Sequence, residues 1–400
     1  MAKLRGGFDP DRVGDPGRIS PVVGKIVSSE IEAEAKGFTE IKIVGVGGGG
    51  NNALNRMIEA GIRGVDFVAV NTDAQALDKS HAMHKIAIGG RSMKRLGAGG
   101  DPMMGERAAE INRDQLEEML SGADMVFITA GMGGGTGTGA SPVIAEIAKR
   151  NRSLTVAVVT MPFTFEGRHR RAVAEQGLQL LTERVDAIIA IPNDRLLAMA
   201  GKRMSLVESF RLADNILRQG VQGISDLITV TGLINLDFAD VKSVMSGAGT
   251  ALMAIGEAKG PTRAMQAAQM AIASPLLDVS VDGATGVLIN VTGGPDMSLI
   301  EVSEAAGLIK DAASPDANII VGAVINPKVQ SELQVTLIAT GFGGSEVRKP
   351  AIKVSDVFAK LDNSNTSLPP TLEPPRPKSP STIDPQDLDM PAFLRRKRVE

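Results

Sequence analysis

The chain has 400 residues, of which 43% are hydrophobic, and a formal net charge of −3. This length allows two globular domains with tails, and the small net charge gives no support to a general nucleic-acid binder. The lack of cysteine excludes disulfides, thiolate metal sites and cysteine nucleophiles, and fits a reducing cytoplasm. There is no apolar run near the ~18 residues of a membrane span and no signal-peptide stretch at the start, so we expect a cytoplasmic protein.

The N-terminal part predicts an arm followed by a first phosphate-binding unit. Residues 1–38 are polar with little periodicity, so we expect them to form a flexible arm. Then come an apolar run at Ile41–Val44, a glycine turn at Gly45–Gly50 and helical spacing at Asn51–Ile58. A glycine turn between a strand and a helix presents backbone amides and the positive end of the helix dipole, which together can bind phosphate.

The same stretch also has a second interpretation. It satisfies G-x-G-x-x-G through Gly45, Gly47 and Gly50, the pattern of dinucleotide-binding folds. The next predicted strand, Phe67–Val70, leads to Asp73, about where such folds place the acid that binds a ribose. An NAD-dependent oxidoreductase is therefore one hypothesis for the function.

A second glycine turn, Gly131–Gly139, weighs against that hypothesis. It lies between a strand predicted at Met125–Ile128 and a helix predicted at Ser141–Ala148, with Pro142 in the first turn of the helix. Two such turns at the carboxyl edge of one sheet can hold a long phosphate chain from both sides, and the two threonine hydroxyls of the second turn can add donors. No G-x-x-x-x-G-K-[ST] occurs, so amides and helix dipoles would replace the P-loop lysine.

Further strands indicate the fold class. Apolar runs at Leu154–Val159 and Ala187–Ile191 continue the alternation of strands and helices, which predicts an α/β fold with a doubly wound, mostly parallel sheet. Between these runs, Glu166 precedes three arginines, among them Arg170. This stretch suits a ribose hydroxyl and anionic phosphates, or it is the solvated start of a helix.

Ser205 and Glu208 form a capping box that predicts the start of a long helix reaching about Ile228. At ~1.5 Å per residue the helix spans ~35 Å, enough to bridge two domains. Phe210 and Asp214 are four residues apart and share one face of this helix. They are either a core ring and a solvated charge, or a ring that stacks on a base and a carboxylate that accepts N–H groups from it.

An acidic junction follows this helix, consisting of Asn235, Asp237 and Asp240. Asp237 is placed to cap the next helix. Carboxylates bind phosphate poorly, but they can orient or polarise an attacking water.

The C-terminal part predicts a second, smaller α/β domain. Its strands are expected at Gly286–Thr292, Asn318–Val324 and Leu333–Ala339, with helices near Arg263–Ser274 and from Ser298 onward. Prolines after this domain mark a disordered linker, and the last residues combine apolar side chains with a basic cluster. This combination favours a peptide that docks on a partner over a tail that only solubilises the chain.

The segment GGGTGTG, at 133–139, closely resembles the signature of the tubulin/FtsZ GTPases. The resemblance runs from about Ile41 to Gly344 and resumes in the last residues. It implies a tubulin-like fold and a GTP hydrolase, with GTP as substrate, GDP as product and an expected Mg²⁺ whose protein ligands are unknown. The nucleotide-binding residues that it implies, with Asp73 added as a further candidate, are Gly48, Gly49, Gly50, Asn51, Asn52, Gly135, Thr136, Gly137, Glu166, Arg170, Asn193, Phe210 and Asp214.

The resemblance also implies that the chain assembles with itself. Asn235, Asp237 and Asp240 would be catalytic residues that complete the GTP site of the next subunit in a head-to-tail filament. Such filaments would form the cytokinetic ring at midcell beneath the inner membrane, so the protein would meet the membrane only indirectly. A membrane-tethering division protein and assembly regulators would bind through Asp389, Met390, Pro391, Phe393 and Leu394.

The expected organisation divides the chain into six parts. They are an arm (1–38), a GTP-binding domain (39–204), a central helix (205–230), a C-terminal domain with the acidic junction (231–344), a linker (345–384) and a docking peptide (385–400). Beside the GTPase and the oxidoreductase, a scaffold that binds nucleotide without hydrolysing it is a third hypothesis.

Overall fold

The computed structural model describes residues 39–342, apart from 91–96, 200–203, 231–233, 235, 278–279 and 328. The described residues all belong to one compact unit of the chain. The predicted arm, linker and docking peptide, including Asp389, Met390, Pro391, Phe393 and Leu394, lie outside these ranges, as does Asn235. Within the described ranges, no helix has the length and apolar character needed to cross a membrane.

A parallel sheet forms the N-terminal layer, as predicted. Its strands lie in the order β3-β2-β1-β4-β5-β6, and each pair is parallel. The strands are β1 (Ile41–Val46), β2 (Asp66–Asn71), β3 (His84–Ala87), β4 (Met125–Gly131), β5 (Leu154–Met161) and β6 (Ala187–Pro192). Because every carboxyl end points to the same edge, the loops that follow β1, β4, β5 and β6 meet there.

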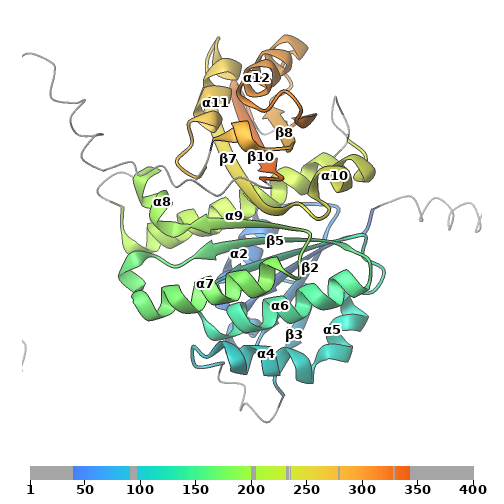
Figure 1. Cartoon of the computed structure of the whole chain (residues 1–400), viewed down its shortest axis with the longest axis vertical. Coiled ribbons are helices and arrows are strands. Elements are labelled where there is room, and N and C mark those ends of the chain that lie inside the picture. Colours follow the sequence, from blue (N-terminus) through green and yellow to red (C-terminus); the bar gives the residue numbers. More distant parts are fainter. Residues whose placement is uncertain are drawn as a thin grey trace, which may run out of the picture. The chain divides into compact units, whose positions relative to one another are not determined.

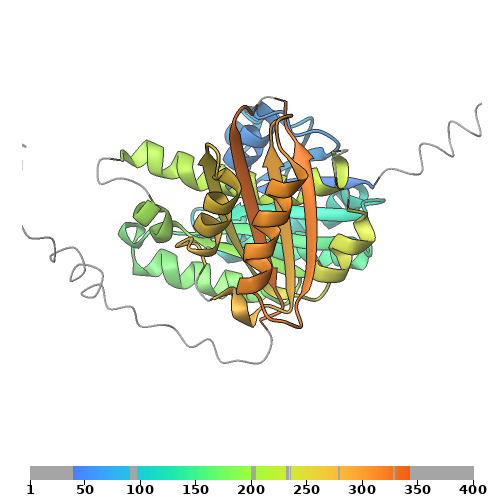
Figure 2. The ribbon, with the colours of Figure 1, turned by 90° about the horizontal axis from the view of Figure 1, so that it is seen from above.

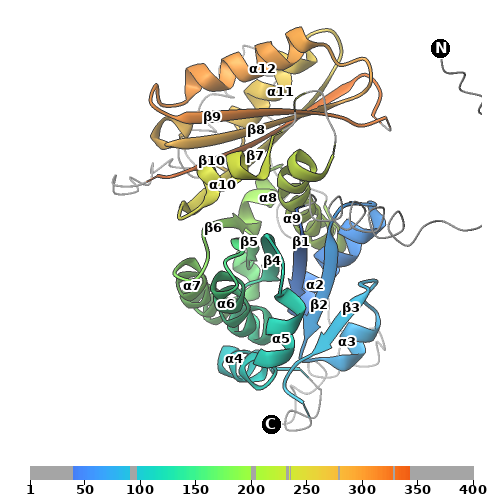
Figure 3. The same cartoon turned by 90° about the vertical axis from the view of Figure 1, so that its right-hand side faces the viewer.

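Helices cover both faces of this sheet, which explains the continuous apolar runs of its strands. Ile43 of β1 belongs to the core on one face, together with α2 and α9, whereas Val44 belongs to the core on the other face, under α4 to α7 (Figure 3). The N-terminal helices are α2 (Gly47–Glu59), α3 (Ala74–Asp78), α4 (Pro102–Ile111), α5 (Arg113–Leu120), α6 (Gly135–Arg150), α7 (Arg168–Thr182) and α8 (Asn193–Met199), with a 3-10 turn η3 (Thr164–Glu166).

The long central helix α9 (Leu206–Thr229) begins and ends as predicted. Its capping box is formed, because Ser205 Oγ accepts from the Glu208 N–H at 3.2 Å and a Glu208 carboxylate oxygen accepts from the Ser205 N–H at 2.7 Å. Two glycines let neighbouring side chains approach the helix closely: a Cβ on Gly220 would lie 3.0 Å from Met253, and one on Gly223 would lie 2.9 Å from Thr336. The helix therefore packs against the C-terminal strands as well as the N-terminal sheet.

A second sheet forms the C-terminal layer, in the strand order β7-β10-β8-β9 (Figure 2). β7 pairs with β10, and β10 with β8, in antiparallel fashion, whereas β8 and β9 are parallel. The first residues of β7 also pair with β6, so this strand joins the two sheets. The elements are α10 (Phe238–Met245), β7 (Gly249–Lys259), α11 (Arg263–Ile272), a 3-10 turn η4 (Val281–Gly283), β8 (Gly286–Gly293), α12 (Leu299–Ala312), β9 (Asn318–Ile325) and β10 (Glu332–Thr340).

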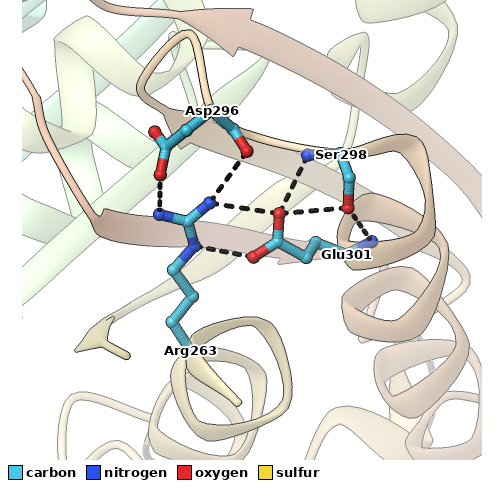
Figure 4. Close-up of polar contacts among 4 residues, drawn as sticks. All are labelled: Arg263, Asp296, Ser298 and Glu301. Atoms are coloured by element: carbon cyan, nitrogen blue, oxygen red, sulfur yellow. Dashed lines mark hydrogen bonds and ion pairs between the residues drawn. The ribbon is translucent and has the colours of Figure 1, made fainter. Parts of the chain in front are cut away.

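A charge cluster around a buried arginine, which we call the Arg263 cluster, ties α11 to α12 (Figure 4). The Arg263 side chain is only 6% exposed, and its guanidinium donates at 2.6 Å to both Asp296 and Glu301. Glu301 also accepts from the Ser298 N–H at 2.8 Å, and thereby caps α12. Arg263 lowers the pKa of Glu301 to about 2, because the guanidinium stabilises the carboxylate.

Two helices begin earlier than the sequence suggests. α6 starts at Gly135 rather than Ser141, so Pro142 lies inside the helix and not in its first turn. α2 likewise starts at Gly47 rather than Asn51. Glycine costs about 1 kcal/mol relative to alanine in a helix, which is why the pattern predicted turns. Tertiary packing decides otherwise: a Cβ at Gly139 would lie 1.9 Å from the Pro102 carbonyl, so only glycine lets α4 approach α6.

Candidate functional site

A pocket of about 430 Å³ lies at the carboxyl edge of the parallel sheet, where α2, α6 and α9 begin. This volume falls within the range of small-molecule sites. Eleven of the fourteen predicted nucleotide-binding residues line it: Gly48, Gly49, Asn52, Gly135, Thr136, Gly137, Glu166, Arg170, Asn193, Phe210 and Asp214.

The two glycine turns form the floor of the pocket and touch each other. A Cβ on Gly47 would lie 2.9 Å from the Gly137 nitrogen, and one on Gly49 would lie 3.3 Å from the Gly131 Cα. Gly47 also has a φ of +70°, which favours glycine. These glycines are therefore required for the turns to pack together, whatever the pocket binds.

Gly48 and Gly134 differ from these packing glycines. No described atom lies within 4 Å of a Cβ built on either residue, and both face the pocket. The helices that begin here, α2 and α6, have no side-chain hydrogen bond at their N-caps among the described residues. Open space beside free helix amides and two positive dipole ends suits an anionic ligand.

One threonine of the second turn contributes to the pocket and the other does not. Thr136 lines the pocket, and its hydroxyl lies 2.6 Å from the hydroxyl of Thr72, a buried residue after β2. Thr138 is buried elsewhere and accepts from the Gly133 N–H at 2.8 Å. The expectation that both hydroxyls serve the ligand is therefore wrong for Thr138, which holds the turn in shape.

Three predicted residues, Gly50, Asn51 and Asp73, do not line the pocket. A Cβ on Gly50 would sit 2.2 Å from the Thr129 carbonyl oxygen, so Gly50 lets α2 pack on β4. Asn51 is 3% exposed, and neither atom of its amide has a partner among the described residues. Asp73 caps α3, accepting from the N–H groups of Gln75 and Ala76. The position expected for a ribose-binding acid of an NAD enzyme is thus engaged in a helix cap.

At the other end of the pocket, acceptors surround an exposed ring. The side chain of Asn193 is 5% exposed, and its Oδ1 has no hydrogen-bond partner among the described residues. The Phe210 ring is 41% exposed and meets the Phe163 ring edge-on at 5.5 Å. Asp214 lies one turn after Phe210. An aromatic face beside an unpaired amide oxygen and a carboxylate suits a planar base with N–H donors.

Asp214 is a partly desolvated carboxylate with one charged partner. Burial raises its pKa, and the Arg56 guanidinium opposes this shift by donating from Nε to Oδ2 at 3.0 Å. Between the two ends of the pocket, Glu166 accepts from the Phe163 N–H at 2.9 Å and pairs with Arg170 at 3.0 Å. Arg170 is half exposed and adds positive charge to the middle of the pocket.

The acidic junction lies away from the pocket. Asp237 caps α10 by accepting from the Asp240 N–H at 2.8 Å, as its position in the sequence predicts. Both carboxylates are exposed, and neither lines the pocket. From Phe210 to Thr229, α9 is roughly 28 Å long at ~1.5 Å per residue. Figure 1 shows α8 and α10 on opposite sides of the molecule, with α9 running between them. One chain therefore does not bring its acidic junction to its own pocket.

Sequence reasoning did not select Arg56 and Thr72, although each contacts a predicted site residue. Arg56 offered one signal, because it stands in the last turn of the helix that follows the first glycine turn. Thr72 precedes Asp73 and offered no signal of its own, since its partner lies 64 positions away. Among the described residues, no group of His, Asp or Glu is arranged to hold a metal ion.

Comparisons with known proteins identify chains of similar sequence and fold. Residues 40–201 match the Tubulin/FtsZ family, GTPase domain, and residues 249–343 match the FtsZ family, C-terminal domain. The chain is 44% identical to an empty FtsZ dimer from M. jannaschii, with a TM-score of 0.75 over 81% of this chain and 93% of that one. A second M. jannaschii FtsZ structure gives 44% identity and a TM-score of 0.76 over 79% and 95%. CetZ2 from Haloferax volcanii, in a GTPgS-bound protofilament, shares the fold at 21% identity, with a TM-score of 0.66 over 81% and 97%.

Proposed function

Because this chain belongs to the Tubulin/FtsZ family and is a GTP hydrolase, we propose that the 430 Å³ pocket is its GTP site. The family assignment argues against the two alternative hypotheses, an NAD-dependent oxidoreductase and a scaffold that binds nucleotide without hydrolysing it. The observation that carries the proposal is the unpaired, buried Oδ1 of Asn193. It stands beside Phe210 and Asp214, at the opposite end of the pocket from the glycine turns.

The phosphates would lie between the two glycine turns. Amides of Gly48 and Gly49 would bind them from one side, and Gly135–Gly137 from the other, with Asn52 at the rim. Glu166 would accept from a ribose hydroxyl, and Arg170 would pair with a phosphate.

At the far end, guanine would stack on Phe210 while Asn193 and Asp214 accept its N–H groups. Gly50, Asn51 and Asp73 would support the site without lining the pocket. Mg²⁺ takes oxygen ligands and keeps several waters, so it would be coordinated by phosphate oxygens and would neutralise part of their charge.

Hydrolysis would require a second copy of the chain. The acidic junction of one subunit, with Asn235, Asp237 and Asp240, would reach the pocket of the next and orient water in line with the γ-phosphate. The bond between the γ-phosphorus and the bridging oxygen breaks, and GDP and phosphate leave. A heterologous contact of this kind does not close on itself, so repetition gives a filament. The FtsZ of M. jannaschii, a protein 44% identical to this chain, was itself solved as a dimer.

Exposed apolar residues at both ends support such a contact. Near the pocket, Phe165 and Val207 are each 60% exposed. At the other end, Leu299 and Ile300 are 69% and 71% exposed in the first turn of α12. Both residues come shortly after β8, whose last residue, Gly293, pairs with Ile325 at the end of β9. Ile234, in the loop before α10, pairs with Ala323, two residues earlier on β9, so the start of α12 and this loop are anchored at nearby positions. Each chain would thus present one apolar patch to the complementary patch of the next.

The cellular role follows from the family. Filaments of the chain would form the cytokinetic ring at midcell, beneath the inner membrane. The docking peptide at 385–400 would recruit a membrane-tethering division protein and assembly regulators.

Nucleotide competition tests the proposed site. A fluorescent GTP analogue bound to the full chain should be displaced by GTP and GDP, and not by ATP or NAD at the same concentrations. Displacement by NAD as readily as by GTP would overturn the assignment of the pocket.

A further inference from the structure

One ion pair links the two ends of the proposed GTP site. Arg56 stands in the last turn of α2, the helix whose first turn is the glycine turn at the phosphate end. Its Nε donates at 3.0 Å to Oδ2 of Asp214, which lies on α9 at the base end, 158 positions along the chain. The same helix therefore begins under the proposed phosphates and ends on the carboxylate proposed to accept from the base.

Arg56 is the cation that contacts Asp214. Glu166 and Arg170 face the same pocket from η3 and α7, but they pair with each other at 3.0 Å. On α9 itself, Arg211 is exposed beside Glu208, and Arg218 donates to amide side chains of its own helix. No other charged group among the described residues forms an ion pair or hydrogen bond with Asp214. The side chain of Asp214 is 14% exposed, so water gives its charge little support.

We propose that Arg56 is a positioning residue for base selection, which holds the Asp214 carboxylate ionised and oriented so that it accepts N–H groups of guanine. The proposal rests on the pocket being the GTP site. An ionised carboxylate only accepts hydrogen bonds, whereas a protonated one also donates and meets the guanine N–H groups donor to donor. Because Nε binds one oxygen, Oδ1 is left for the base.

The proposal gives a pH dependence with a definite sign. Burial raises the pKa of Asp214, and Arg56 opposes this shift. Without the guanidinium, the pKa of Asp214 rises further, so protonation begins at a higher pH. Guanine binding should then weaken as the pH falls, and it should do so at a higher pH in the variant than in the wild type.

The variants Arg56→Met and Arg56→Lys test the proposal, with Arg63→Met as matched control. Arg63 follows the end of α2, is exposed, and has no ion pair or hydrogen bond among the described residues, so its loss changes the net charge equally. Dissociation constants of the full chain would be measured for GTP, ITP and ATP between pH 5.5 and 8.5. ITP lacks the exocyclic amino group of guanine, so the ratio of GTP to ITP affinity reports that contact.

We expect Arg56→Met to weaken GTP binding by roughly 10- to 100-fold at pH 6, the loss typical of a hydrogen bond to a charged group. The loss should be smaller at pH 8, and the preference for GTP over ITP should fall. Arg56→Lys should recover part of the affinity, because it keeps the charge without the planar fork. Arg63→Met should show the same dependence of GTP affinity on pH as the wild type. Because GTP itself titrates equally in all samples, comparison with this control removes that contribution.

The outcomes separate this proposal from the one on which it rests. If wild type shows no preference for GTP over ATP, the pocket assignment fails. If wild type prefers GTP but Arg56→Met keeps the wild-type pH profile and GTP-to-ITP ratio, Arg56 has only a structural role and the inference is wrong. Thermal unfolding of each variant checks folding, and if Arg56→Met does not fold, Arg56→Lys carries the same two readouts.

Discussion

The two ends of α9 differ in almost every physical respect. At its N-terminal end, Phe210 and Asp214 face a concave pocket with a buried acceptor that lacks a partner and glycines beside open space. At its C-terminal end, Asp237 and Asp240 are exposed, and the Asp237 carboxylate caps α10 by accepting from the Asp240 N–H. The first end can bind a nucleotide but offers no free carboxylate to a water near the phosphates. The second end offers two exposed carboxylates, neither of which lines the pocket at the first end. Under the proposed function, each chain would therefore carry two halves of a hydrolytic site, one at each end of α9.

Substitution at the acidic junction should have the largest effect. Asp237→Asn keeps a good N-cap for α10, so folding should be preserved. We expect turnover to fall by roughly 10²- to 10⁴-fold, the usual contribution of a group that assists proton transfer, while GTP affinity stays unchanged. Phosphate release and GTP titration on the same preparation measure both quantities. Substantial turnover in this variant would remove Asp237 from the mechanism.

The Arg263 cluster has no residue in the pocket or in the acidic junction, so its loss should affect stability rather than nucleotide binding. Arg263→Met leaves Glu301 without its cation and should lower the free energy of unfolding by about 3 kcal/mol. GTP affinity per folded molecule should not change, because the cluster contributes no residue to the pocket. Because Arg263 depresses the folded-state pKa of Glu301 from 4.5 to about 2, its contribution is fully present above pH 4.5 and is lost as the pH falls toward 2.

Urea titrations at several pH values check this prediction. The deficit of the Arg263→Met variant relative to wild type should shrink below pH 4.5. A constant deficit down to pH 2 would show that packing, and not the ion pair, accounts for the loss.

Glycines of the first glycine turn should divide into two classes. Gly48→Ala adds a methyl group where no described atom lies within 4 Å, so stability should hold while GTP affinity falls by roughly 10-fold from the lost space. Gly50→Ala should instead lower the free energy of unfolding by roughly 1–3 kcal/mol, because its Cβ would overlap the Thr129 carbonyl. Calorimetric binding and thermal unfolding separate these effects. Equal behaviour of the two variants would mean that the open space has no ligand.

The smallest effect is expected at Thr72. With an anionic phosphate as acceptor, the Thr136 hydroxyl donates to the ligand and accepts from Thr72. Thr72→Val keeps the shape and removes the hydroxyl, so GTP affinity should drop by roughly 3- to 10-fold, the worth of one neutral hydrogen bond. Thr72→Ser should retain wild-type affinity. Identical affinities for the Val and Ser variants would remove Thr72 from phosphate binding.

Much of the fold could be predicted because apolar runs and helix caps are local signals. The strands at Ile41–Val46 and Leu154–Met161 and the capping box at Ser205 belong to this class. β7, Gly249–Lys259, escaped prediction, because a run rich in glycine and alanine has little strand propensity and becomes a strand by pairing with β6 and β10.

The phosphate end of the pocket followed from the two glycine turns, since strand ends and helix starts meet at one sheet edge, whereas Asn193 and the ligand roles of Phe210 and Asp214 followed from the family resemblance. What escaped depends on contacts through space. The pairs Arg56–Asp214 and Thr72–Thr136 join residues 158 and 64 positions apart, and no spacing within one element indicates them.

The most direct test of the account is GTP hydrolysis measured against protein concentration, with light scattering recorded in the same samples. If the active site is completed between subunits, activity per molecule should appear only above a threshold concentration, and scattering should rise at that same concentration. A rate proportional to protein from the lowest concentration would mean that each chain carries its full site, and the role given to Asp237 and Asp240 would be wrong.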